Sequence, residues 1–101
     1  MIIREWRARA SLAQAEAYPS HFQTKVVPDL KLLPGFAGAH LCRRRLGDGI
    51  EFLVLTRWKS MDVIRAFAGS EIDNAVVDPG AAAALIDFDA KVQHYEVIEE
   101  A

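Results

Sequence analysis

Three histidines and one cysteine are the side chains of this chain best suited to act as bases, nucleophiles or metal ligands. His94 lies in the segment VQHYEV, where a neutral histidine at the wall of a pocket could accept a proton from a substrate. His94 is therefore our candidate catalytic residue, although a purely structural role fits the same position. Because adjacent residues of a strand point to opposite faces, His94 cannot share a pocket with Tyr95.

The remaining polar candidates do not predict a metal site. His21, His40 and Cys42 show none of the close spacings that zinc or iron sites use, so a ligand set would need residues brought together by the fold. The run Arg43 to Arg45 could hold an anionic substrate, but on a strand its middle arginine points away from the other two. Charges of this kind commonly protect the edge of a sheet, which is the interpretation that we prefer.

Large aromatic side chains could line a cavity for a planar ligand between the helices and the sheet. The residues that we expect at its wall are Trp6, Phe22, His40, Trp58 and Phe67. Aromatic residues at core spacing also commonly fill a core without leaving a cavity. An open cavity with His94 or His40 at its wall would favour an enzyme, whereas a filled interior would favour a dimer without turnover.

The stretch from Glu51 to Gly69, EFLVLTRWKSMDVIRAFAG, positions several of these residues. Its first half predicts a central strand because apolar side chains alternate onto both faces, with Phe52, Val54 and Trp58 on one and Leu53 and Leu55 on the other. Ser60 then predicts an N-cap, followed by an amphipathic helix that ends at Gly69. The helix must fold back over the sheet.

The rest of the chain completes a β-α-β-β-α-β order. We expect a strand over residues 2–9, with Ile2, Arg4, Trp6 and Ala8 on one face. A long helix should follow, from a capping box at Ser11 and Gln14 to Leu33, with breaks at Pro19 and Pro28. We then expect a strand over 36–46, a hairpin turn at 47–49, a short helix from Asp78 to Ile86 and a last strand over 91–98. This order predicts an α+β, ferredoxin-like fold with helices on one face of a four-stranded antiparallel sheet.

The length and composition fit a single domain over residues 1–101. A formal net charge of -2 gives no reason to expect nucleic acid or an anionic membrane as a partner. We find neither a signal peptide nor a long apolar run, so we expect a cytoplasmic protein. Because the central strand is apolar on both faces, we expect the uncovered face of the sheet to pair with a second copy in a homodimer.

The Trp58-x-Ser60 joint, the following AFAG and the closing VQHYEV together resemble the antibiotic biosynthesis monooxygenase (ABM) superfamily. The resemblance implies a dimeric α/β barrel in which two sheets pack back to back. The superfamily includes cofactor-free oxygenases and haem-degrading enzymes. In the haem-degrading branch an asparagine, a tryptophan and an iron-binding histidine stand at the positions that match Trp6, Phe67 and Val77 here. All three differ, so the resemblance makes haem degradation the second choice.

The branch that oxidises polyketides uses no metal or flavin, and the resemblance to it implies that this chain needs no cofactor. Its phenolic substrate loses a proton, and the resulting anion reduces oxygen. The protein supplies a dry pocket, orientation and a proton acceptor. We therefore expect a cofactor-independent monooxygenase that acts on a small aromatic or polyketide-like substrate. A haem-degrading relative and a non-catalytic ligand-binding or structural dimer stay open as alternatives.

Overall fold

The computed structural model describes all 101 residues, and its central layer is an antiparallel sheet. The strands are β1 (Ile2–Ser11), β2 (Phe36–Leu46), β3 (Gly49–Trp58), β4 (Asp87–Phe88) and β5 (Gln93–Glu96). They lie in the order β2-β3-β1-β4, and β5 pairs with the other end of β1. The expected last strand over 91–98 is shortened to β5, and β4 is an additional short strand along the same edge of β1. The ferredoxin-like α+β plan is confirmed.

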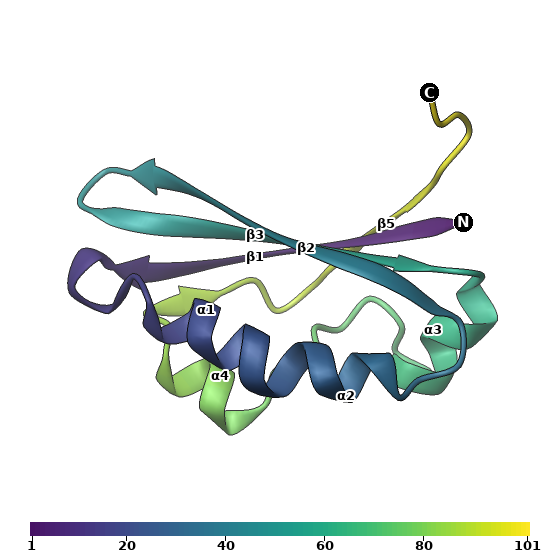
Figure 1. The fold of residues 1–101 in the computed structure, drawn as a ribbon, viewed down its shortest axis with the longest axis horizontal. Helices are drawn as coiled ribbons and strands as arrows, with labels where there is room; N and C mark the ends of the chain where they lie inside the picture. The colour runs from purple at the N-terminus through teal and green to yellow at the C-terminus, as the bar shows by residue number, and fades with distance from the viewer.

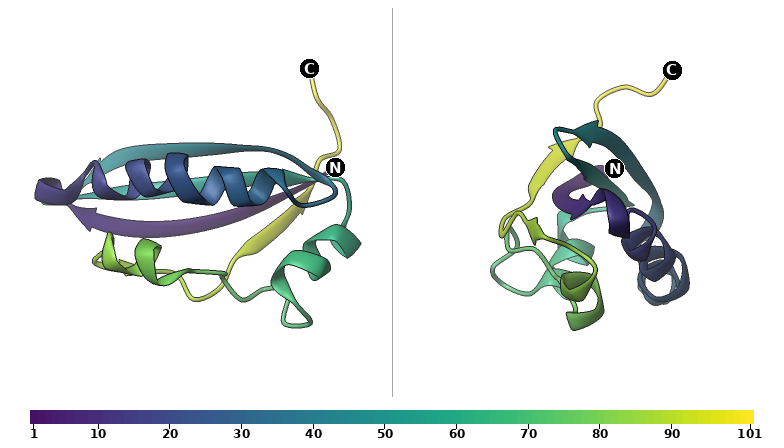
Figure 2. Two further views of the ribbon diagram at one scale, coloured as in Figure 1. Left: turned by 60° about the horizontal axis from the view of Figure 1, so that its bottom comes forward. Right: turned by 90° about the vertical axis from the view of Figure 1, so that its left-hand side faces the viewer.

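All helical segments lie on one side of the sheet, and the other side carries no helix (Figures 1 and 2). They are the 3-10 helix Leu12–Gln14, α1 (Ala17–His21), the π-helix Phe22–Val26, α2 (Val27–Lys31), α3 (Met61–Ala68) and α4 (Pro79–Ala83). None of these helices has both the length and the apolar character needed to cross a membrane.

The first long helical segment is split, as its two prolines predict. Pro28 has no N–H to continue the helical bonding, and the turn before it widens into the π-helix that separates α1 from α2. The expected capping box is wrong: the Ser11 side chain makes no cap hydrogen bond, and Leu12–Gln14 forms a 3-10 turn before α1 begins at Ala17. The split segment still runs along the sheet as one continuous rod (Figure 2).

The two other helices begin at the caps that the sequence predicts. The Ser60 Oγ accepts a hydrogen bond from the Val63 N–H at 3.4 Å, and α3 ends at Gly69, whose φ of 83° favours glycine. The Asp78 Oδ1 accepts the Ala81 N–H at 2.8 Å at the start of α4. That helix ends at Ala83, earlier than expected, because the chain then turns to bring β4 alongside β1.

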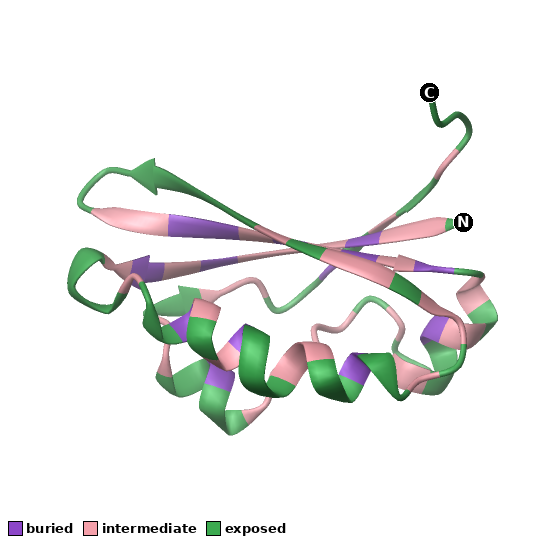
Figure 3. Cartoon of the chain, viewed as in Figure 1, coloured by how far each residue is buried: buried purple, intermediate pink, exposed green.

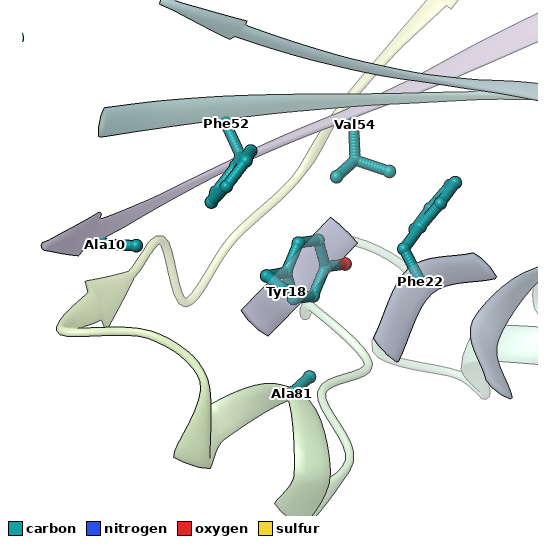
Figure 4. Packing of buried hydrophobic residues seen from close by; sticks show 6 residues of the cluster. All are labelled: Ala10, Tyr18, Phe22, Phe52, Val54 and Ala81. Carbon is teal, nitrogen blue, oxygen red and sulfur yellow. The ribbon is translucent and has the colours of Figure 1, made fainter. Parts of the chain in front are cut away.

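Two apolar clusters join the helices to the sheet, and buried residues concentrate on the surfaces that face each other (Figure 3). One cluster gathers Tyr18, Phe22 and Phe52 below the C-terminal half of β1 (Figure 4). The other gathers Leu30, Trp58 and Ile64 at the opposite end of the sheet.

Candidate functional site

A cavity of about 370 Å³ lies between the helices and the sheet, within the size range of small-molecule sites. Its wall is mainly apolar, with a few charged and hydroxyl groups. The lining residues are Arg4, Trp6, Tyr18, Lys25, Val26, Asp29, Leu30, Leu33, Val54, Thr56, Phe67, Val76, Asp78, Ala81 and Val92. They come from both sheet and helices, so the cavity exists only in the folded chain.

Trp6 gives the cavity a rigid aromatic wall. Its indole N–H donates to the Asp89 carbonyl oxygen at 2.7 Å, which fixes the ring. The ring also contacts Tyr18 edge-on with 6.1 Å between centroids and packs against Phe88 at 5.8 Å. With its only donor used by the backbone, Trp6 offers the cavity an apolar surface on which a planar ring can pack.

The structure places two of the five expected wall residues on the cavity. Trp6 and Phe67 line it, whereas Trp58 is fully buried beneath Phe67, with 5.1 Å between their stacked rings. Phe22 belongs to the apolar cluster around Tyr18 and Phe52. Trp58 and Phe22 therefore support the walls from behind, which corrects the expectation that they line the cavity.

His40 does not reach the cavity. It pairs with Leu55 and is exposed on the sheet face that carries no helix. A β-bulge between Phe36 and Gly38 explains the error, because one extra residue reverses the faces to which the following side chains point. Phe36 therefore packs against Trp58 on the helix side, while His40, an even number of residues later, points away.

Arg4 is the most buried charged residue at the cavity, with only 5% of its surface exposed. Its Nη1 donates to the Ile72 carbonyl oxygen at 2.7 Å and to the Nε2 of His94 at 2.9 Å, and its Nη2 donates to the Asn74 carbonyl oxygen at 2.8 Å. Burial lowers the Arg4 pKa to about 10, against the opposing effect of the Asp73 charge. Arg4 thus stays charged at neutral pH.

His94 lies behind Arg4 and does not line the cavity. Because an arginine only donates, the His94 Nε2 must accept, which leaves the proton on Nδ1, 3.3 Å from the Asp73 carboxylate. Burial and the Arg4 charge lower the His94 pKa, and they outweigh the opposing effect of Asp73. His94 is therefore neutral at pH 7, as a proton acceptor should be, but its free lone pair is taken by Arg4.

Tyr18 brings a hydroxyl group to the cavity. Only 3% of its surface is exposed, yet its hydroxyl makes no hydrogen bond within the chain, and no fully buried polar side-chain atom lacks a partner. The hydroxyl must therefore open onto the cavity that Tyr18 lines; in Figure 4 it points toward the side of Phe22. Burial, followed by the charge of Asp78, raises the Tyr18 pKa, so the group remains a protonated donor.

Asp78 places a carboxylate at the same wall. It accepts the Ala81 N–H at the start of α4 and lies 2.9 Å from the Nε2 of His21. Burial would raise the Asp78 pKa, but the hydrogen bonds from the Ala81 N–H and His21 outweigh this effect and lower it. Asp78 is therefore an ionised acceptor at neutral pH, and its side chain is itself 38% exposed.

Sequence reasoning named neither Arg4, Tyr18 nor Asp78 as a site residue. Asp78 was expected only as a helix cap, and its second role depends on α4 packing beside the cavity. Arg4 carried a usable signal, because the alternation of the first strand places it on the same face as Trp6 and Ala8. A charged residue on the apolar face of a central strand needs a partner.

The wall does not fit haem. No histidine, cysteine or methionine lines the cavity, and Val77 packs against the apolar cluster around Tyr18. Tyr18 is the one wall residue of a type that ligates haem iron, and its raised pKa disfavours the phenolate form that would bind. No three histidine, cysteine or acidic side chains of the chain gather as a metal site.

Comparison with protein families matches residues 1–79 to the family described as antibiotic biosynthesis monooxygenase. This chain belongs to that family. The matched segment contains Arg4, Trp6, Tyr18 and Asp78, and ends before β4. No curated protein matches the chain at a significant level.

Solved structures of this fold have low sequence identity to the chain. A Deinococcus radiodurans protein assigned to the same family is 19% identical with a TM-score of 0.65, and the match covers 100% of this chain and 96% of that one. SnoaB, a cofactor-independent oxygenase from Streptomyces nogalater, is 17% identical with a TM-score of 0.63, over 98% and 93%. MhuD with manganese protoporphyrin IX bound is 21% identical with a TM-score of 0.62, over 100% and 98%. These matches show a shared fold.

Proposed function

We propose that this chain is a cofactor-independent monooxygenase that oxidises a small aromatic or polyketide-like substrate in the helix-side cavity. The observation that carries the proposal is the cavity itself, which combines aromatic walls at Trp6 and Phe67 with the Tyr18 hydroxyl and the Asp78 carboxylate. Family membership supports an oxygenase, and the similar fold of SnoaB, a cofactor-independent oxygenase, supports the absence of a cofactor.

The proposed reaction converts a ring CH2 group of a hydroxylated aromatic into a carbonyl. Loss of one proton gives a delocalised anion, which transfers one electron to dioxygen. The substrate radical and superoxide then combine to form a C–O bond, and the peroxide takes up a proton. Loss of the second hydrogen from that carbon as a proton, with cleavage of the O–O bond, leaves the carbonyl and releases water.

Two wall groups fit the proton steps of this reaction. We assign the first proton to the Asp78 carboxylate, whose partly exposed side chain can pass the proton on to solvent. The protonated Tyr18 hydroxyl donates a hydrogen bond to the substrate oxygen on which negative charge develops. The apolar walls keep water from the anion while it reacts with dioxygen.

The role of His94 changes with the geometry. A direct proton transfer would need the Nε2 lone pair that Arg4 occupies. We therefore propose that His94 is a positioning residue, which holds Arg4 at the wall and is itself oriented by Asp73.

We also propose that the working form is a homodimer through the sheet face that carries no helix. Leu53 and Leu55 point to this face from the centre of β3, and both are only half-buried in the single chain. A second copy packed on this face would cover them without blocking the cavity, which lies on the opposite side of the sheet.

Dioxygen uptake tests the proposed function. Protein treated with a chelator and dialysed should consume one dioxygen for each molecule of a hydroxylated anthrone, and the product should gain one oxygen atom and lose two hydrogens. Labelled dioxygen should supply the new oxygen atom. A rate equal to that of the buffer, with protein that binds the anthrone in the cavity, would contradict the oxygenase and leave a binding protein.

A further inference from the structure

Arg4 is a buried cation that makes no direct ion pair, because the Asp73 carboxylate, whose charge raises the Arg4 pKa, contacts His94 instead. No carboxylate oxygen lies within 4.0 Å of its guanidinium, whereas Arg7, Arg9 and Arg44 each form an ion pair. A charge buried without a counter-ion is unfavourable, and hydrogen bonds to neutral carbonyl oxygens compensate only part of that cost. An ion that supplies the missing negative charge must therefore be favoured at this position.

The guanidinium also retains unused donors. Of the five N–H groups of an arginine, Ile72, His94 and Asn74 occupy one each, which leaves the Nε–H and one Nη2–H. The Nε–H lies on the edge of the planar group that, together with Nη2, can bind a carboxylate through two parallel hydrogen bonds. Arg4 lines the cavity, so a molecule inside it meets this residue.

Thr56 adds a third donor at the same place. It is the cross-strand neighbour of Arg4 and lines the cavity with it. The Thr56 Oγ1 accepts the indole N–H of Trp58 at 2.8 Å, so the hydroxyl hydrogen is left to donate. Phe67 flanks the group, with the Arg4 guanidinium 5.6 Å from its ring centre.

We propose that Arg4 and Thr56 bind the carboxylate of an aromatic acid, which lies along the cavity with its hydroxyl group toward Tyr18 and Asp78. This inference rests on the proposed function and names its substrate class. A single negative charge fits because Lys25, the other cation at the wall, is already paired with Asp29. The carboxylate would lie away from Asp78, because Arg4 is near the start of β1, whereas Asp78 caps α4, whose Ala81 clusters with Ala10 near the end of β1.

Matched ligands test the proposal on the unmodified protein. Calorimetry would compare 6-hydroxy-2-naphthoate with its amide, which has the same shape without the charge, and with 2-naphthol, which is neutral at pH 7. The acid should bind at least about 10-fold more tightly than both, because a charge-assisted pair of hydrogen bonds replaces neutral ones. Equal affinities of acid and amide would overturn the carboxylate site but would leave oxygenation of a neutral phenol standing.

A variant pair then assigns the effect to Arg4. Arg4→Gln should bind acid and amide equally, whereas Arg65→Gln, which removes an exposed charge from α3, should keep the preference. Circular dichroism establishes that each variant is folded, and Thr56→Val, with a smaller loss of preference, serves if Arg4→Gln does not fold. A preference for the acid that survives in Arg4→Gln, or in a folded Thr56→Val at full strength, would overturn the proposal. Dioxygen uptake, measured separately, decides the proposed function.

Discussion

The two faces of the sheet differ in how their buried charged residues are paired. On the face without helices, Glu51 is only 8% exposed, and its carboxylate lies 3.5 Å from Arg7 and 2.9 Å from Arg44. On the helix side, Arg4 is buried to a similar degree without a carboxylate in direct contact. Charges on the first face satisfy one another within the chain, whereas the helix side keeps a cation with unused donors.

The hydroxyl and carboxylate groups of the helix side extend this contrast. Tyr18 is buried without a hydrogen bond, and Asp78 faces the cavity as well as capping α4. A buried hydroxyl without a partner, such as that of Tyr18, is free to bind a ligand, and the folded chain makes no structural use of it. The difference between the faces is what we expect if the face without helices serves stability and assembly and the helix side binds the substrate.

The largest expected effect follows removal of the proposed proton acceptor. Asp78→Asn should lower dioxygen uptake by about 100-fold or more, since general base catalysis typically contributes at least this factor. Asparagine caps helices as well as aspartate does, so α4 should remain. Asp87→Asn, which removes a carboxylate paired with Arg9 at β4, should leave the rate within a factor of two of the unmodified protein. An equal loss of dioxygen uptake in the two variants would contradict a special role for the Asp78 carboxylate at the cavity.

A charge introduced on the face without helices should weaken dimer formation without affecting ligand binding. Leu55→Glu would bring a second carboxylate beside Glu5 and oppose like charges across a two-fold interface. Sedimentation should find the unmodified protein dimeric at micromolar concentration and the variant at least about 10-fold weaker in self-association. Naphthoate binding to the variant should persist if it is folded. A monomeric unmodified protein would contradict the proposed interface.

The free energy of unfolding should fall when a paired polar group is removed, and it should change little when an unpaired one is removed. Glu51→Gln should lower the free energy of unfolding by about 1 kcal/mol, because it weakens two partly exposed ion pairs. Tyr18→Phe should change it by less than about 0.5 kcal/mol, because its hydroxyl has no partner to lose. Urea denaturation at pH 7 measures both. A larger loss for Tyr18→Phe than for Glu51→Gln would show that the hydroxyl is structural.

The smallest effect concerns pH. The His94 pKa in the folded chain lies below its ordinary value of 6.5, so the unfolded chain binds more protons in that range. Stability from neutral His94 is complete above pH 6.5 and is lost as pH falls through the lower folded pKa. Between pH 7 and pH 5 the unmodified protein should therefore lose more stability than His94→Gln. Parallel pH profiles would show that Arg4 does not depend on a neutral His94.

Local signals in the sequence were sufficient for the fold. The caps at Ser60 and Asp78, the turn at Gly47 and the alternation along β1 each depend on neighbouring residues, and each is present in the structure. The bulge after Phe36 was missed, although Gly38 lies within the strand and has a positive φ of 150°, and a glycine inside a strand often marks a bulge.

The candidate site was harder to predict, because it depends on which side chains have no ion-pair or hydrogen-bond partner in the folded chain. Alternation placed Arg4 beside Trp6, but only the folded chain shows that no carboxylate reaches Arg4 and no partner reaches the Tyr18 hydroxyl. Alternation left the face of His94 open, and its bond to Arg4 places it on the helix side of its strand. Its distance from the cavity was not predictable, since the longer side chain of Arg4 occupies the intervening space.

A crystal structure with bound 6-hydroxy-2-naphthoate would test the central claim most directly. The ligand should occupy the helix-side cavity between Trp6 and Phe67, with its carboxylate on the free edge of Arg4 and its hydroxyl within hydrogen-bond distance of Tyr18 or Asp78. The paired charges around Glu51 should not move. A ligand found on the face without helices, or one whose carboxylate avoids Arg4 inside the cavity, would contradict the account.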